Sequence, residues 1–178
     1  WKFKIKNMKK IILISILSIV TISCKNENKY GYISIDDDKT EMIKKVFNSV
    51  SNEEITYLEE VFSSDLIFTN SDNEEFNKDE FIAGVKDIFD LFEDIEFDVD
   101  NMGDAEDSEI ETNYYSNGLV WTAVWNNFSA KGKYSGKEIS FPFHISYQWK
   151  GNKIIKEVQY FSTKVFDNEK IARENISK

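Results

Sequence analysis

The chain has 178 residues, of which 41% are hydrophobic and 15% aromatic, and this composition is typical of one globular domain with a substantial core. Its formal charge is −10, and all five basic residues before Cys24 stand in a segment without acids, so the rest is more acidic still. An acidic surface repels the phosphates of nucleic acids, and no strong basic cluster offsets it. We therefore expect no nucleic-acid partner.

The N-terminal segment has the pattern of an export signal. Lys9 and Lys10 precede the uncharged apolar run IILISILSIVTI, from Ile11 to Ile22. A membrane span needs roughly 20 apolar residues, so this shorter run has the length of a signal-peptide core. We predict that residues 1–23 are a signal peptide, with residues 1–7 upstream of a start at Met8.

The signal ends at the sequence Thr21-Ile22-Ser23-Cys24, which resembles the lipobox of bacterial lipoproteins. In that motif a small residue precedes a Cys that is lipidated, although Thr21 stands where Leu is usual. Cys24 is the only Cys, so it cannot form an internal disulfide, and lipidation would use its thiol. The resemblance implies a lipid anchor on Cys24 in a bacterial cell envelope, and Lys25 after it favours the outer membrane.

Residues 24–38 are polar and poor in aliphatic side chains, so we expect a flexible tether there. Two amphipathic helices should follow, the first with Asp38 and Glu41 as a capping pair and the second with Ser51 and Glu54. Their apolar residues recur at helical spacing, as Met42, Ile43, Val46, Phe47 and Val50, then Ile55, Leu58 and Phe62.

A short strand and a third helix are expected next. The strand is Leu66–Thr69, and Asn77 with Glu80 caps a helix whose apolar positions are Phe81, Val85, Ile88 and Phe92. A strand then alternates apolar and acidic residues through Ile95, Phe97 and Val99.

The aromatic-rich stretch 117–166 predicts an antiparallel meander, because three apolar runs alternate with the turns KGKYSGK and KGNK. A strand at Glu111–Tyr115 should enter it through a turn at Asn117-Gly118. The fold class is therefore α+β, with one domain at residues 39–168 and a C-terminal tail at 169–178.

The region from about Lys39 to Phe166 resembles the nuclear-transport-factor-2-like superfamily, especially its SnoaL-like bacterial members. The resemblance rests on Asp65-Leu66-Ile67-Phe68, Lys153-Ile154-Ile155 and Gln159-Tyr160-Phe161-Ser162. Asn152 replaces the usual Gly, and Ser162 replaces a usual Asp that can lie near the pocket. The resemblance implies a cone-shaped, strongly bent antiparallel sheet against three N-terminal helices, with a pocket between them.

The lone His144 is the obvious candidate for a general base, which such a family enzyme uses together with a Tyr or acid that hydrogen-bonds the oxyanion. Alternation along its strand, however, puts the bulky side chains Phe141 to Trp149 on the face opposite His144. We therefore expect His144 to be structural or to lie in a dimer interface, and we assign no catalytic residue. The aromatic candidates for lining a pocket, which could equally be core, are Trp121, Trp125, Tyr147 and Tyr160.

The acidic stretch 98–109 resembles a calcium-binding EF-hand loop. Acids occupy positions 1, 3, 7, 9 and 12, with Gly103 at position 6; these acids are Asp98, Asp100, Asp104, Glu106 and Glu109. Met102 stands where an oxygen ligand is needed, and the flanks predict strands. A solvated acidic loop is the simpler interpretation.

Two kinds of function are consistent with these patterns, and no cofactor is expected for either. The first is a lipid-anchored binding module for a small apolar ligand or an envelope protein, which could form a homodimer through the sheet face. The second is a SnoaL-like isomerase, cyclase or hydratase acting on a hydrophobic molecule by general acid-base chemistry. The absence of an acid-base pair at recognisable spacing favours the binding module.

Overall fold

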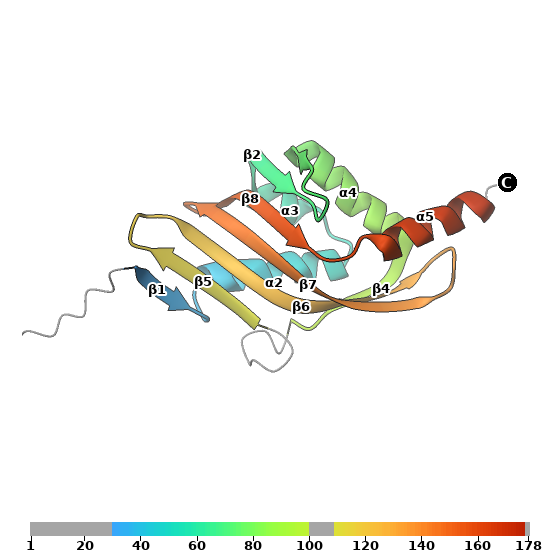
Figure 1. The fold of residues 1–178 in the computed structure, drawn as a ribbon, viewed down its shortest axis with the longest axis horizontal. Coiled ribbons are helices and arrows are strands. Elements are labelled where there is room, and N and C mark those ends of the chain that lie inside the picture. Colours follow the sequence, from blue (N-terminus) through green and yellow to red (C-terminus); the bar gives the residue numbers. More distant parts are fainter. Residues whose placement is uncertain (1–29, 100–108, 177–178) are drawn as a thin grey trace, which may run out of the picture. The chain divides into compact units, whose positions relative to one another are not determined.

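The computed structural model describes residues 30–99 and 109–176 (Figure 1). From Gly31 onward these residues form one unit, in which helices pack on a sheet. The helices before the meander are α2 (Asp38–Ser51), α3 (Thr56–Val61) and α4 (Lys78–Leu91). Its three long strands are β6 (Val120–Gly132), β7 (Glu138–Lys150) and β8 (Lys153–Tyr160), which confirms the predicted meander.

The remaining strands extend the sheet on both sides of the meander. They are β1 (Gly31–Ser34), β2 (Phe62–Thr69), β3 (Glu75–Phe76), β4 (Phe92–Phe97) and β5 (Glu109–Tyr115). The order is β1-β5-β6-β7-β8-β2-β3, and the long β6 also pairs with β4 at its far end. In the part of the chain that the structure describes, no helix is both long enough and apolar enough to cross a bilayer.

The prediction of a purely antiparallel sheet was wrong, because β2 and β8 are parallel. No hairpin connects these two strands, since one helix and five strands, from β3 to β7, lie between them in the chain, and so no short turn fixes their relative direction. All other pairs are antiparallel. The strong bend and the cone shape that the resemblance implies stay predictions.

The helices are not all N-terminal, because α5 (Lys164–Ile176) follows the sheet where a tail was expected from residue 169. Figure 1 shows α5, in red, beside the end of α4. Glu169 fixes this helix to the β6–β7 turn: it accepts hydrogen bonds from the backbone N–H groups of Tyr134 and Ser135 at 2.7 and 2.9 Å. This contact joins distant segments, so helical periodicity alone did not reveal it.

Two of the three expected helix starts need correction. Asp37, not Asp38, caps α2 by accepting from the N–H groups of Lys39 and Thr40, and α3 has no side-chain cap. The capping box of Asn77 and Glu80 at α4 is confirmed. Phe62 and Phe92, expected as the last helical residues, instead begin β2 and β4, so each helix passes directly into a strand.

Part of the expected tether belongs to the sheet, because β1 pairs with β5. The ring of Tyr32 stacks on that of Tyr114, with 4.7 Å between ring centroids. The Tyr114 hydroxyl donates to the Asp37 carboxylate at 2.6 Å, which links this edge to the start of α2. Pairing, stacking and capping together hold the segment in place.

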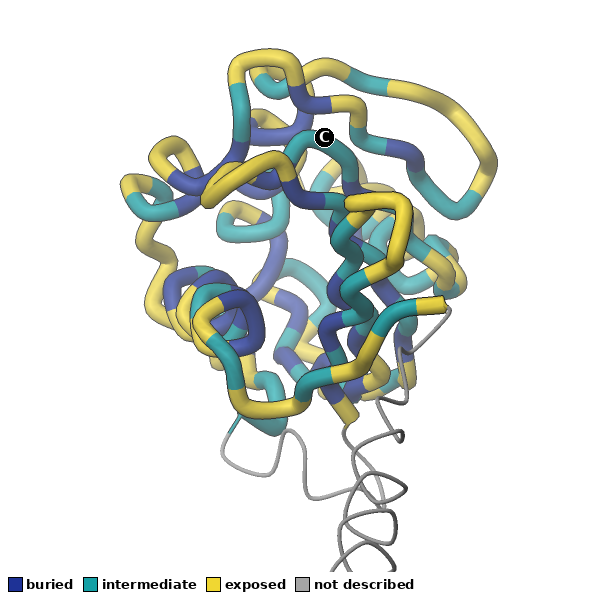
Figure 2. The backbone as a smooth tube through the Cα atoms, turned by 90° about the vertical axis from the view of Figure 1, so that its left-hand side faces the viewer, coloured by how far each residue is buried: buried dark blue, intermediate teal, exposed yellow. Residues whose placement is uncertain are grey.

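Burial alternates along the long strands β6 and β7, and Figure 2 colours the described backbone by burial. On β7 the side chains of Phe143, Ile145, Tyr147 and Trp149 are buried, which is the face predicted from their bulk. They pack with apolar residues of α2, α3 and α4 in one core. The inner face of β6, β7 and β8 is therefore the face that the helices cover.

Candidate functional site

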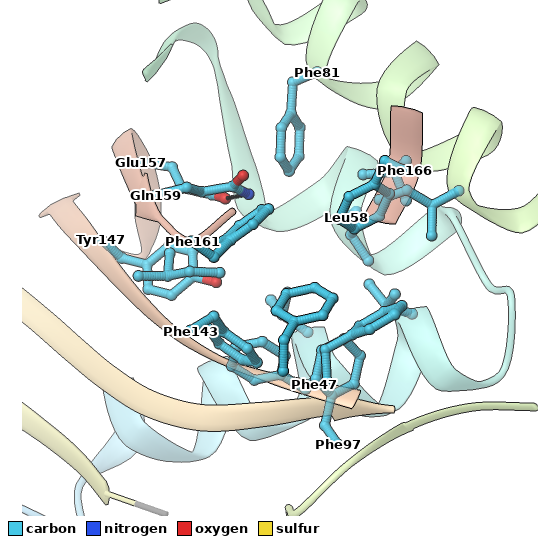
Figure 3. A pocket seen from close by; sticks show the side chains of 17 residues that line it. Phe47, Leu58, Phe81, Phe97, Phe143, Tyr147, Glu157, Gln159, Phe161 and Phe166 are labelled. Atoms are coloured by element: carbon cyan, nitrogen blue, oxygen red, sulfur yellow. Dashed lines mark hydrogen bonds between the residues drawn. The ribbon is translucent and has the colours of Figure 1, made fainter. Parts of the chain in front are cut away.

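A cavity of about 90 Å³ lies between this inner face and helices α2, α3, α4 and α5. Eight phenylalanines and Tyr147 contribute aromatic rings to its wall, and aliphatic side chains such as Leu58 fill most of the remainder. Figure 3 shows rings from several elements converging on the space, including Phe47, Phe81 and Phe143. Such a lining favours the apolar part of a small molecule.

A β-bulge in β8 decides which residues of that strand face the cavity. Trp149 of β7 pairs with Ile154, whereas its neighbour Gln148 pairs with Lys156, so Ile155 is an extra residue. An extra residue reverses the alternation of the side chains that follow it. The side chains beyond the bulge therefore face the side opposite to the one expected by counting from the buried Ile154.

Glu157 and Gln159 are the polar side chains that the bulge turns inward. They lie opposite Tyr147 and Ile145 of β7, and both line the cavity. Their polar ends reach toward the space beside Phe81 in Figure 3. Strict alternation from Ile154 predicts an outward Glu157, which explains why the sequence analysis missed it; the adjacent pair Ile154-Ile155 was the signal of a bulge.

Glu157 is a carboxylic acid held almost entirely out of water, with 2% of its surface exposed. Burial raises the pKa of Glu157 to about 8, and the hydrogen bond from the Gln159 amide, at 2.7 Å, acts in the opposite direction. The neutral acid is therefore the main form at pH 7. The second carboxyl oxygen accepts no hydrogen bond from any described residue.

Tyr147 is the third polar residue at this end of the cavity, beside Glu157 and Gln159. Burial and the nearby Glu157 raise the pKa of Tyr147, so its hydroxyl stays protonated. That hydroxyl makes no hydrogen bond to another described residue. A hydroxyl, a carboxyl and an amide thus meet in an aromatic cavity, where they can bind one polar group of a ligand or exchange a proton with it.

A larger groove of about 460 Å³ lies next to the cavity, between α4, α5 and the β2–β3 turn. The two hollows share six lining residues, which are Phe81, Val85, Ile88, Gln159, Phe161 and Phe166. Gln159 therefore stands between Glu157 and the groove. Because the two hollows share these lining side chains, the groove lies directly beside the cavity.

Of the four aromatic residues expected to line a pocket, the structure places Tyr147 at the cavity. Trp125 and Tyr160 lie on the outer face of the sheet, where 42% and 60% of their surfaces are exposed. Trp121 shares the outward parity of Trp125 on β6. The register explains the difference: Trp125 pairs with His144, and residues paired directly across two strands share a face.

His144 lies between Trp125 and Tyr160 on the outer face. Its ring centroid is 4.5 Å from that of Trp125 and 5.6 Å from that of Tyr160. Its Nε2 is 3.0 Å from the Ser146 hydroxyl, and burial lowers the pKa of His144. His144 is not among the residues that line the cavity, whereas Glu157 and Tyr147 are.

Other predicted sites fall partly or wholly outside the described residues. Cys24 does, and so do Asp100, Asp104 and Glu106 of the calcium candidate, while Asp98 and Glu109 lie at the ends of the two described ranges. Within those ranges, no three acidic, His or Cys side chains are grouped closely enough to hold a metal ion. Ser162 is exposed, and the buried carboxyl on this part of the chain is instead that of Glu157.

Solved structures resemble this arrangement closely enough to establish the fold. A provisionally named polyketide cyclase of Pseudomonas putida gives a TM-score of 0.58 at 12% identity, covering 75% of this chain and 98% of that one. A nuclear-transport-factor-2-like protein of unknown function from Burkholderia pseudomallei gives 0.52 at 10% identity, covering 75% and 97%. The chain has the nuclear-transport-factor-2-like fold.

A provisionally named SnoaL-like polyketide cyclase of a Jannaschia species has the same fold, with a TM-score of 0.56 at 12% identity, covering 76% of this chain and 92% of that one. No protein-family model and no curated protein matches the sequence. Identities this low establish the nuclear-transport-factor-2-like fold alone, so the activity must be argued from the residues of the cavity.

Proposed function

We propose that this domain binds a small, largely apolar molecule in the cavity and holds its one polar group with Glu157, Gln159 and Tyr147. The observation that carries the proposal is the burial of Glu157 among aromatic rings with one hydrogen-bond partner. A buried acid without an opposite charge destabilises a fold, and binding sites are where such features concentrate. A ligand that contacts the second carboxyl oxygen accounts for it.

The cavity volume limits the size of this ligand. Sites for drug-sized molecules measure roughly 300–1,000 Å³, whereas this cavity measures about 90 Å³. The inner part of the ligand therefore has only a handful of non-hydrogen atoms. A longer molecule would extend into the groove of about 460 Å³.

Native mass spectrometry of the purified chain tests the binding function. We expect a small molecule to remain bound to the wild type and to be lost from Glu157→Leu, which keeps the bulk but removes the polar contact. Glu138→Leu, an exposed position on the same sheet, is the matched control and should keep it. Equal retention by Glu157→Leu would contradict the role of Glu157. A wild type that carries no ligand, and that no small fragment stabilises against heat, would contradict the function.

Acid-base catalysis is the second candidate, and the pKa of about 8 for Glu157 favours it. A general acid or base works best when its pKa lies near the working pH, and the Tyr147 hydroxyl could hydrogen-bond a carbonyl oxygen beside it. Structurally similar proteins named as polyketide cyclases make a carbonyl substrate reasonable. The test is hydrogen-deuterium exchange beside the carbonyl of 3,3-dimethylbutan-2-one, followed by NMR. Exchange no faster than with Glu157→Gln would exclude this chemistry for that ketone.

We further propose that the domain is anchored in a bacterial envelope, at the outer membrane, through lipid on Cys24. The support is the order of basic residues, apolar run and Cys in residues 9–24. Mass spectrometry of the membrane fraction should find a lipid-modified N-terminal Cys24, and Cys24→Ser should release the protein from membranes. An unmodified Cys24 in the mature protein would contradict the anchor.

A homodimer through the outer sheet face is the remaining proposal. Trp125, His144 and Tyr160 form an aromatic row across three strands, and two of the three are substantially exposed. Such a row suits a second copy of the sheet better than water. Light scattering should give twice the chain mass for the wild type and the monomer mass for Trp125→Lys. A monomeric wild type would refute this proposal.

A further inference from the structure

We propose that the ligand of the cavity is a small organic ammonium ion, whose alkyl groups pack against the aromatic rings and whose positive charge faces Glu157. The inference rests on the ligand site proposed above and adds the charge of the ligand. Three features of the described residues support it: the rings of the wall, the absence of a basic side chain in the cavity, and the acidic groove beside it.

The wall of the cavity has the character of an aromatic cage. Rings from α2, α4, β4, β7 and the start of α5 surround the space, among them Phe47, Phe81, Phe97, Phe143 and Phe166 (Figure 3). The face of an aromatic ring carries partial negative charge, so it attracts cations and disfavours anions. Water binds an alkylated ammonium group weakly, because alkyl groups cover its charge. The free energy of hydration lost when it enters the cavity is therefore small. The cage therefore suits this class of cation.

Glu157 lacks the opposite charge that a buried carboxylate requires. Glu157 and Tyr147 are the titratable residues that line the cavity, and no Lys, Arg or His is among its described lining residues. A fully buried acid is rare unless it is paired. Gln159 occupies one carboxyl oxygen, which leaves the other available. An ammonium ion at that oxygen supplies the missing charge.

The groove through which a ligand would enter is acidic. Of the described residues, Lys170 is the one basic side chain that lines it, against the acids Asp72, Glu74, Glu80, Asp87 and Asp167. Lys170 and Arg173 already pair with Asp87, at 3.3 and 3.0 Å. The remaining acids give the groove a negative potential, which concentrates cations and repels carboxylate and phosphate ligands.

Proton linkage separates an ammonium ligand from a neutral one. An ammonium ion requires ionised Glu157, whereas a carbonyl or alcohol oxygen accepts a hydrogen bond from the protonated acid. Since burial raises the pKa of Glu157 to about 8, a cation must displace a proton at pH 7. Its affinity should therefore rise with pH, whereas the affinity of a neutral acceptor should fall. The pKa of Tyr147 is raised, so Tyr147 adds no titration in this range.

Calorimetric titration of the full chain with three molecules of nearly equal shape tests the charge directly. Choline carries a permanent positive charge, 3,3-dimethylbutan-1-ol is its neutral carbon analogue, and 3,3-dimethylbutanoate is an anion. We expect choline to bind at least tenfold more tightly than the alcohol, and the anion not to bind. Between pH 6.5 and 7.5 the choline affinity should rise several-fold, up to the tenfold limit for one displaced proton.

Two substitutions test whether the preference for choline over the alcohol arises in the cavity and in the groove. Glu157→Gln preserves shape and should abolish the preference for choline over the alcohol, while Asp72→Asn in the groove should weaken choline binding a few-fold and leave the alcohol unchanged. Glu138→Gln, on exposed surface, should change neither. Circular dichroism verifies that each variant is folded.

The outcomes distinguish this inference from the binding function on which it rests. If the alcohol binds as well as choline and both need Glu157, the ammonium class is wrong and a neutral ligand takes its place. If choline binds equally well to Glu157→Gln, the cavity is not its site and the inference fails. If neither molecule binds while native mass spectrometry still finds a ligand that depends on Glu157, the ammonium class is again wrong, but the binding function stands.

Discussion

The two faces of the sheet formed by β6, β7 and β8 have similar residues and different chemistry. Both faces carry large aromatic side chains, which surround the carboxyl of Glu157 on the inside and the imidazole of His144 on the outside. The helices cover the inner face, whereas Trp125 and Tyr160 on the outer face remain substantially exposed. Burial thus raises the pKa of Glu157 far above the ordinary value of a carboxyl. The lone His144 lies outside the cavity and is therefore the weaker candidate for a catalytic or binding group.

The largest expected difference between the faces is in packing. Phe143→Ala removes a buried ring that lies 5.7 Å from the ring of Phe47 and 5.8 Å from that of Phe97, and it should lower the free energy of unfolding by about 3–5 kcal/mol. At concentrations where the chain is monomeric, Trp125→Ala on the outer face removes a larger side chain but should cost less than about 1 kcal/mol. Denaturant unfolding measures both. Equal losses would mean that the outer face is buried too, as in a stable dimer.

The second difference is the dependence of stability on pH that Glu157 causes. Its pKa is about 8 when folded and lies in the ordinary range of Glu when unfolded, so its favourable contribution is complete below about pH 4.5 and is lost as pH rises toward 8. In that interval the free energy of unfolding should fall by at most about 1.4 kcal/mol per pH unit. Glu157→Gln should remove this slope and raise the melting temperature at pH 8.

Glu138→Gln is the control for this measurement, because Glu138 is an exposed acid on the same sheet. It should leave the slope between pH 5 and 8 unchanged. In the ligand-free protein, a wild-type melting temperature that stays constant over this range, with no gain from Glu157→Gln, would show that folding does not raise the pKa of Glu157. That result would remove the physical basis of the proposed site.

The covered face could be predicted from sequence because its signals are local. Helical spacing and the Asn77 capping box identified the helices before the meander, and Gly-bearing turns identified the meander itself. Helix α5 was missed because a distant contact, from Glu169 to the Tyr134–Ser135 turn, holds it in place. The parallel pairing of β2 with β8 also joins distant segments, so no short pattern encodes it.

The site was harder to predict than the fold because it depends on register. His144 was assigned outward from the bulk of its neighbours, but its pairing with Trp125 cannot be read from either strand alone. The bulge at Ile155 then exchanged the faces of Tyr160 and Glu157. A one-residue change of register moves every later side chain to the opposite face of the sheet. Alternation therefore assigned Glu157 to the outer face, although its side chain lines the cavity.

Helix α5 is one of the helices that cover the inner face of the sheet. Glu169 is the residue expected to attach it to the β6–β7 turn. Its carboxylate accepts from the N–H of Tyr134 and from the N–H and hydroxyl of Ser135, at 2.7, 2.9 and 2.5 Å. Glu169→Gln should lower the free energy of unfolding by about 1.5–3 kcal/mol. Glu174→Gln, on the exposed side of the same helix, should have no effect.

Lowering the pH should reduce the free energy of unfolding in the same way as Glu169→Gln, because it protonates the Glu169 carboxylate. Burial acts to raise the pKa of Glu169, but the hydrogen bonds from Ser135 and Tyr134 and the charge of Lys137 lower it overall. The stabilisation is therefore present above the ordinary pKa range of Glu and is lost as pH falls below it. Hydrogen exchange of α5 amides, faster in Glu169→Gln or in acid, would show that this carboxylate attaches the helix. Unchanged exchange in Glu169→Gln would assign the attachment to Phe166 and its apolar contacts instead.

The smallest effect is expected from His144, and its sign should be opposite to that of Glu157. Burial lowers the pKa of His144, so its contribution to stability is present above about pH 6.5 and is lost as pH falls through its folded pKa. Because His144 is the only histidine, His144→Gln should remove this loss between pH 7.5 and 5.5. Melting temperatures are best compared in a Glu157→Gln background, where the opposing slope is absent. A slope that persists in the double variant would show that neither face controls stability in this range.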